Sequence, residues 1–215
     1  MARPNLDISS QDPDCNSKHT SAGVGFLEEL TKGFPTFLLL PKTINKKNST
    51  NIVFGDGNPD SRIMLIGEGP GYNEDLEGLP FVGRAGNLLD KMLASINLDR
   101  SNVYISNVVN FRPPENRKPT EIEIKRYLPF LEKHIEIIKP KILILLGSTA
   151  MNALIGDKFV ISKVRGQWIE KKFGECKTSV IVTFHPAFLM RQPAQKKMAW
   201  IDLKMIREKK SKLKI

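Results

Sequence analysis

Cysteine is almost absent from this chain. Only Cys15 and Cys176 occur among its 215 residues, and they form no Cys-x-x-Cys pair. A disulfide framework or a metal site made of four thiolates therefore cannot form within one chain. So few cysteines favour a reducing compartment, and we expect a cytoplasmic protein.

Long apolar runs are missing as well. No segment reaches the roughly 18 to 20 consecutive apolar residues that a membrane-spanning helix needs. The first residues include Asp7, Asp12 and Asp14 and lack the basic-then-apolar order of a signal peptide. We therefore expect no membrane partner.

Acidic residues are outnumbered by basic ones. The chain has 33 Lys and Arg against 23 Asp and Glu, a formal net charge of +10, which favours a polyanionic partner such as nucleic acid. Its 40% of hydrophobic residues is an ordinary value for one globular domain. We expect a flexible polar leader over residues 1–21, one domain over 22–208 and a basic tail over 209–215.

Several common enzyme motifs are also absent. Ser148 follows Gly147 without the Gly-x-Ser-x-Gly frame of a nucleophile elbow, and no Walker lysine or His/Cys metal cluster occurs. Residues 67–71 contain three glycines, but a dinucleotide-binding loop requires another glycine where Tyr72 stands. A nucleotide-binding oxidoreductase remains an alternative that leaves the polar residues described next unexplained.

Four apolar runs alternate with helical patterns along the chain. These runs end at Ile66, Ser106, Leu146 and Thr183. Continuous apolar strands between helices predict an α/β fold with a parallel sheet covered on both faces. A small hairpin is expected around residues 164–174, and the acidic segment after the glycine loop is expected to be a loop.

Right-handed crossovers place the ends of parallel strands on one edge of the sheet. The four loops after the strands then bring together Glu68, Asn107, Ser148 and His185. Bland roles remain open, because a lone histidine is more often structural, Asn107 could cap its strand, and Phe81 could belong to the core. A neutral imidazole at such an edge can also donate a hydrogen bond to an oxygen that gains negative charge.

Six segments follow one another in a distinctive order: residues 67–71 (GEGPG), 79–86 (LPFVGRAG), 107–110 (NVVN), 112–117 (RPPENR), 164–166 (VRG) and 185–189 (HPAFL). Together they resemble the motifs of the type-4 (family 4) uracil-DNA glycosylases, from about residue 52 to residue 203. The resemblance implies a three-layer α/β/α sandwich with a central four-stranded parallel sheet. It also implies a monomer that flips uracil out of DNA and excises it.

The resemblance assigns roles to single residues. Glu68 matches the acid that positions the attacking water, and His185 matches the imidazole that hydrogen-bonds the uracil O2 atom. Gly69 lies where the backbone contacts the base, Phe81 matches the stacking aromatic, and Asn107 matches the amide that reads the uracil edge. Glu68 and His185 are therefore the expected catalytic residues.

The same resemblance suggests a DNA-binding set. Leu189 matches the side chain that fills the gap left by the flipped nucleotide. Independently of the resemblance, Ser148 at the start of a predicted helix and the positively charged Arg191 are expected to contact phosphates. Gly71 and Asn116 lie in matching motifs and complete the set.

Substrate choice is expected to depend on two positions. Cytosine should be rejected because its amine meets the Asn107 amide in the wrong donor pattern, and thymine because its methyl group collides with a wall near Tyr72. An alternative is a catalytically degenerate relative that binds DNA without cutting it, in which Glu68 and His185 are passive.

The chain departs from the family in one respect. Members usually carry an iron–sulfur cluster on four cysteines, and the corresponding positions here lie near Leu40 and Thr43, at Phe111, and at Arg126 or Tyr127. None of these residues is cysteine, so the cluster cannot be built as in the family. We expect no cofactor or metal, and expect apolar packing of Phe111 and Tyr127 to hold the loop instead.

Overall fold

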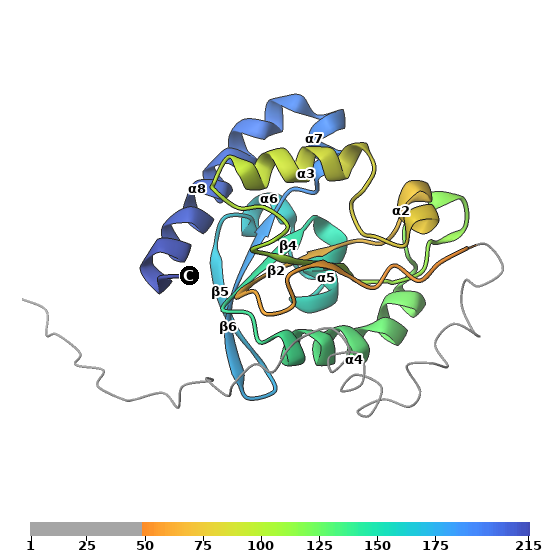
Figure 1. The fold of residues 1–215 in the computed structure, drawn as a ribbon, viewed down its shortest axis with the longest axis horizontal. Helices are drawn as coiled ribbons and strands as arrows, with labels where there is room; N and C mark the ends of the chain where they lie inside the picture. Colours follow the sequence, from red (N-terminus) through yellow and green to blue (C-terminus); the bar gives the residue numbers. More distant parts are fainter. Residues whose placement is uncertain (1–48) are drawn as a thin grey trace, which may run out of the picture.

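The computed structural model describes residues 49–215 of the chain (Figure 1). The leader predicted over residues 1–21 and the positions Leu40 and Thr43 lie outside the described residues. Within the described part, strands and helices alternate from β1 (Asp56–Gly57) to α8 (Lys196–Leu213).

A six-stranded sheet with the strand order β1-β3-β2-β4-β6-β5 forms the centre of the fold. Its four inner strands are parallel to one another: β3 (Tyr104–Asn107), β2 (Ile63–Gly67), β4 (Ile142–Leu146) and β6 (Cys176–Thr183). These are the four strands that the apolar runs predict. Their residues are almost all buried, as strands covered on both faces should be.

The expectation of a four-stranded sheet is wrong in its count, because two antiparallel strands extend the edges. The two-residue strand β1 pairs with β3, and β5 (Trp168–Phe173) pairs with β6. The predicted hairpin exists, but it is formed by β5 and β6 and belongs to the sheet. The polar sequence of β5 does not read as a buried strand, because an edge strand is covered on one side only.

Helices cover both faces of the sheet and give the three predicted layers (Figure 1). One face is covered by α3 (Arg84–Ala94), α7 (Pro186–Arg191) and α8. The other is covered by α4 (Glu121–Ile138) and α5 (Ser148–Leu154). Short helices α2 (Tyr72–Glu77) and α6 (Ile161–Val164) and the 3₁₀ turns η2 (Pro114–Asn116) and η3 (Pro193–Gln195) lie in the connections.

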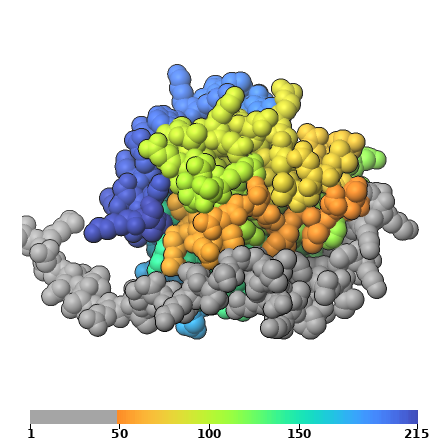
Figure 2. Space-filling model, viewed as in Figure 1, coloured from red at the N-terminus to blue at the C-terminus, as the bar shows by residue number. Residues whose placement is uncertain are grey.

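Strand β2 shows how the two cores separate. Ile63 and Leu65 point into the cluster beneath α3 and α8, whereas Met64 and Ile66 point into the cluster beneath α4 and α5. This alternation follows from the two-residue period of a strand. In the space-filling view, α3 and the turn after it pack directly beside α8 (Figure 2).

Two connecting segments differ from the sequence prediction. The acidic segment after the glycine loop contains α2, which begins after Gly71 and ends at Gly78 in the left-handed conformation. Helix α8 continues to Leu213, so most of the expected basic tail is helical. Lys210 and Lys212 in its last turn favour the helix C-terminus electrostatically. No helix within residues 49–215 is long and apolar enough to cross a membrane.

Candidate active site

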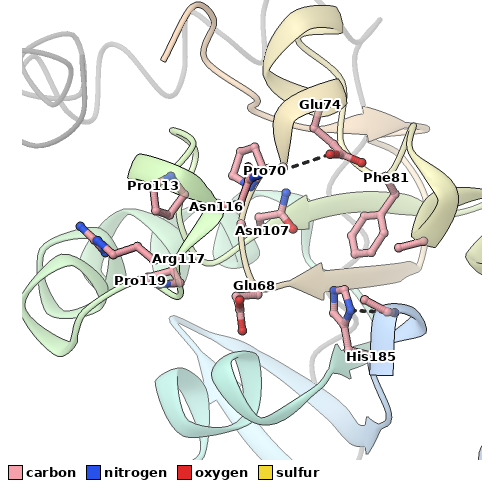
Figure 3. A pocket seen from close by; sticks show the side chains of 14 residues that line it. Glu68, Pro70, Glu74, Phe81, Asn107, Pro113, Asn116, Arg117, Pro119 and His185 are labelled. Atoms are coloured by element: carbon pink, nitrogen blue, oxygen red, sulfur yellow. Dashed lines mark hydrogen bonds between the residues drawn. The ribbon is translucent and has the colours of Figure 1, made fainter. Parts of the chain in front are cut away.

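The loops after β2, β3, β4 and β6 meet at the carboxyl edge of the sheet and surround two cavities. We call the first, of about 220 Å³, the slot; its lining includes Glu68, Gly69, Phe81, Asn107, Asn116 and His185 (Figure 3). It is smaller than the cavities of about 300–1,000 Å³ that hold drug-sized ligands, and suits one flat ring.

The second cavity, of about 390 Å³, we call the hollow. It shares Glu68, Asn116, His185 and Ala187 with the slot. The lining that belongs to the hollow alone includes Lys118, Ser148, Phe188 and Arg191. The structure thus gathers the four loop residues that the sequence places together, and adds a cationic compartment beside them.

His185 is fixed in orientation by the start of α7. Its Nδ1 atom accepts a hydrogen bond from the Ala187 backbone N–H at 3.2 Å, which leaves Nε2 to carry the proton of the neutral ring. Burial lowers the pKa of His185, and the nearby Glu68 charge opposes this effect. The ring lies 5.6 Å from the Phe81 ring, centroid to centroid. His185 is therefore a neutral donor in the wall of the slot.

Glu68 is held by a residue that sequence reasoning missed. The Thr149 hydroxyl, at the start of α5, donates a hydrogen bond to Glu68 Oε2. The carboxylate points away from Asn107 and Phe81 in Figure 3 and lies in the wall shared by slot and hollow. Two hydroxyl residues, Ser148 and Thr149, follow Gly147 in the sequence, and only Ser148 was predicted to have a role.

Asn107 presents a buried amide to the slot. Its side chain is 3% exposed and makes no hydrogen bond to any residue of the described part. Because Asn107 also lines the slot, its amide is available to a bound molecule. A Cβ atom at Gly67 would lie 2.4 Å from Asn107 Oδ1, and one at Gly69 would lie 2.6 Å from Val109. Glycine at these two positions therefore leaves space for the side chains of Asn107 and Val109.

Phe81 has an unusual backbone conformation, with φ of 56°, which is uncommon for a residue with a side chain. Arg100 holds it there, because its guanidinium donates to the carbonyls of Pro80 at 3.0 Å and Phe81 at 2.5 Å. Asp56 and Asp90 bind the same guanidinium at 2.5 and 3.0 Å. Sequence reasoning missed Arg100, since no local pattern links it to a residue 19 positions earlier.

Glu74 joins the two segments that frame the slot. Its Oε2 accepts from the Gly71 N–H at 3.1 Å, and its Oε1 accepts from the Gly83 N–H at 3.0 Å. Gly71, which was expected to bind DNA, lines the slot, and its N–H is already bonded to Glu74. Glu74 was not predicted as a site residue. Its place in the first turn of α2, where an acidic residue can cap the helix, was the feature that could have indicated it.

The wall expected near Tyr72, against the methyl group of thymine, does not include Tyr72 itself. Tyr72 does not line the slot and is 55% exposed, because α2 begins at this residue and turns its side chain outward. Pro70 and Glu74 form part of the lining on this side instead.

The proline-rich loop is anchored by charge. Arg117 donates two hydrogen bonds to Glu123, both of 2.7 Å, and these lower the Glu123 pKa to about 2. Glu123 also forms the predicted capping box of α4 with Thr120. In the loop itself, Asn116 accepts a hydrogen bond from Arg112 at 2.7 Å. Asn116 and Arg117 are thereby held at the slot.

Comparison with known proteins shows which family the chain belongs to. The family model of the uracil DNA glycosylase superfamily matches residues 54–204. The chain belongs to this superfamily. Among its relatives, the type-4 uracil-DNA glycosylase of Thermotoga maritima is 49% identical over 145 residues, 67% of this chain and 74% of that protein. The proteins of the same name from Sulfurisphaera tokodaii and Archaeoglobus fulgidus are 45% and 40% identical, over 74% and 75% of this chain and 74% and 83% of theirs.

The superfamily resemblance raises the question of the iron–sulfur cluster. Phe111 and Tyr127 stand at two of its expected positions, and both are buried in the core beneath α4 and α5. Neither these residues nor Arg126 can supply a thiolate, so this part of the chain does not fit the cluster. Within residues 49–215 no group of three or more His, Cys, Asp or Glu could hold a metal ion.

Leu189 does not occupy the place expected of a residue that enters DNA. Its side chain is 1% exposed and packs in the core beneath α3 and α8. Four residues after His185 the short helix α7 has turned its apolar side inward, whereas Arg191 remains exposed in the lining of the hollow. The predicted insertion role of Leu189 is therefore wrong for the side chain as it lies.

Proposed function

We propose that this member of the superfamily is a uracil-DNA glycosylase of base excision repair, which hydrolyses the N-glycosidic bond of uracil in DNA. The observation that carries the proposal is the slot itself. A neutral histidine donor, an amide without a hydrogen bond to a described residue, and an aromatic ring line one space of single-ring size. The proposal includes action as a monomer.

Substrate entry requires a flipped nucleotide, because the reacting bond is inaccessible within a base stack. In the slot, the uracil ring would lie against Phe81. Its polar edge would meet the Asn107 amide, which has one acceptor and one donor side. Cytosine presents the opposite pattern at that edge and would leave the buried amide mispaired, which is strongly unfavourable.

Bond cleavage leaves negative charge on the departing uracil and positive charge on the sugar. His185 Nε2–H would donate to the uracil O2 atom as this charge grows. One such donor in a site sheltered from water is worth about 3 kcal/mol of barrier. Because the ring is neutral before the reaction, it acts by hydrogen bonding and needs no proton transfer.

Glu68 would serve the other half of the reaction. Its carboxylate, oriented by Thr149, lies in the wall between slot and hollow, where the sugar of a flipped nucleotide would pass. A carboxylate there orients water toward C1′ and stabilises the sugar cation. Thr149 is a positioning residue in this scheme.

The hollow would receive the DNA backbone. Lys118 and Arg191 supply positive charge, and the Ser148 hydroxyl supplies a hydrogen-bond donor. Contacts of this kind position DNA without reading its sequence. They also offset the few kcal/mol that flipping requires.

Packing and charge would replace the iron–sulfur cluster as the support of the proline-rich loop. The burial of Phe111 and Tyr127 and the Arg117–Glu123 pair support this proposal. Purified protein should contain no stoichiometric iron or acid-labile sulfide. Finding both in stoichiometric amounts would refute it.

The function is tested with a uracil-containing oligonucleotide, incubated with the protein and then treated with alkali. Strand breaks at the uracil position, absent when cytosine or thymine replaces uracil, are the expected result. DNA binding without any breaks would instead identify the degenerate, non-cutting relative.

A further inference from the structure

A stacked pair of side chains lies beside the slot and has no role in the chemistry above. The guanidinium of Arg112 covers the Tyr72 ring, with Cζ 5.0 Å from the ring centroid. Tyr72 nevertheless stays 55% exposed. The ring therefore offers a large aromatic surface to solvent while one contact fixes its position.

Both residues are attached to the slot. Tyr72 directly follows Gly71, and Arg112 donates to the side chain of Asn116 at 2.7 Å. Gly71 lines the slot, and Asn116 lines both cavities. The pair thus lies next to residues that line the slot.

Arg112 also keeps its charge available. Its side-chain partners in the described part are a neutral amide and an aromatic ring, and no carboxylate pairs with it. An aromatic face beside an uncompensated cation is the combination with which proteins bind single-stranded nucleic acid.

A second observation points to single strands. Proteins that deform duplex DNA frequently insert an apolar side chain into the base stack. The residue expected to do this, Leu189, is buried in the core. In a single strand no such gap has to be filled, and the neighbouring base is free to turn onto a protein ring.

We propose that Tyr72 and Arg112 form a stacking platform for the base adjacent to the flipped uracil in single-stranded DNA. The proposal rests on the proposed function. The platform adds affinity for single strands, whereas in a duplex the neighbouring base stays paired and gains little from it.

The test compares Tyr72→Ala and Tyr72→Phe on one uracil oligonucleotide, used single-stranded and as a duplex. Tyr72→Ala should lower kcat/KM on the single strand about tenfold, through KM, because stacking on one aromatic contributes on this order. Its effect on the duplex should stay below about twofold by the same reasoning. Tyr72→Phe should match the unchanged protein, because it retains the ring.

Leu76→Ala is the matched control, because Leu76 lies one turn later on α2, is 53% exposed and does not line the slot. It should leave both substrates unaffected. Equal losses on both substrates for Tyr72→Ala, or no loss on either, would overturn the platform.

A binding readout separates this proposal from the proposed function. A 2-aminopurine base placed beside the uracil should be quenched by the unchanged protein and by Tyr72→Phe, and should stay bright with Tyr72→Ala. A protein that quenches but never excises uracil keeps the platform and refutes the glycosylase. A protein that excises uracil without Tyr72-dependent quenching keeps the glycosylase and refutes the platform.

Discussion

The slot and the hollow share one wall, yet they differ in whether their charged side chains are paired. In the slot, the charges of Glu74 and Arg117 are already bonded to backbone N–H groups and to Glu123. In the hollow, neither Lys118 nor Arg191 pairs with a carboxylate of the described part. A neutral base suits the first and an anionic backbone suits the second, so under the proposed function the glycosidic bond would lie at the shared wall.

His185→Ala removes the donor from the shared wall and should have the largest effect. The excision rate should fall about 100- to 1,000-fold, as when one oxyanion donor is lost. DNA affinity should stay nearly intact, because Lys118, Ser148 and Arg191 in the hollow are unchanged. Single-turnover rates and fluorescence anisotropy measure the two quantities, and an unchanged rate would remove His185 from the mechanism.

Asn107→Asp alters recognition inside the slot alone. The ratio of uracil to cytosine excision should fall by about two orders of magnitude, because the buried amide pattern that rejects cytosine is lost. Paired oligonucleotides that differ only in this base provide the measurement. Undiminished discrimination would mean that the base edge is read elsewhere.

Phe81→Ala and Arg100→Ala test whether Arg100 acts by positioning the Phe81 ring in the slot. Each should lower kcat/KM about tenfold, since stacking on one ring contributes on this order. Because Arg100 acts through the Phe81 backbone, the double variant should be no worse than Phe81→Ala alone. Multiplicative losses would show that Arg100 acts independently, and thermal melting of each variant controls for misfolding.

The pH profile follows from the burial of His185. Burial lowers its pKa below the ordinary value of about 6.5, and the ring must be neutral to act as proposed. The rate should therefore stay level as pH falls through 6.5 and decline only when pH passes the lowered pKa. An NMR titration of the ring should give the same midpoint; a decline that begins above pH 6.5 would contradict the neutral donor.

Arg191→Gln changes only the hollow and should have the smallest effect. The slope of log affinity against log salt should become shallower by about 1, with kcat at saturation unchanged. Lys125→Gln is a charge-matched control, because Lys125 lies on α4 and lines neither cavity. An identical shift in both variants would show that net charge, and not the hollow, sets the salt response.

The sequence was sufficient for the residues that follow strands. Glu68, Asn107, Ser148 and His185 each stand just after an apolar run, and parallel strand ends must share an edge. Residues that act through distant partners were not predictable in this way. Thr149 binds a residue 81 positions earlier, and Glu74 reaches a backbone N–H nine positions later.

Leu189 was assigned from its place in a motif, and the slot wall was expected near Tyr72. Neither assignment could show on which side of a short helix a side chain lies. Packing beneath α3 and α8 turned Leu189 inward, and the start of α2 turned Tyr72 outward. The prediction of four strands left out the edge strands because β1 is only two residues long and β5 is polar.

The sequence by itself determined the layer order, the inner strands and the loops that carry the site, because hydrophobic periodicity and chain connectivity are local properties. Only the tertiary structure decided which tautomer His185 adopts, what holds Glu68 and Phe81, and which side chains remain exposed. Those features depend on hydrogen bonds and packing between segments far apart in the chain, and no local pattern records them.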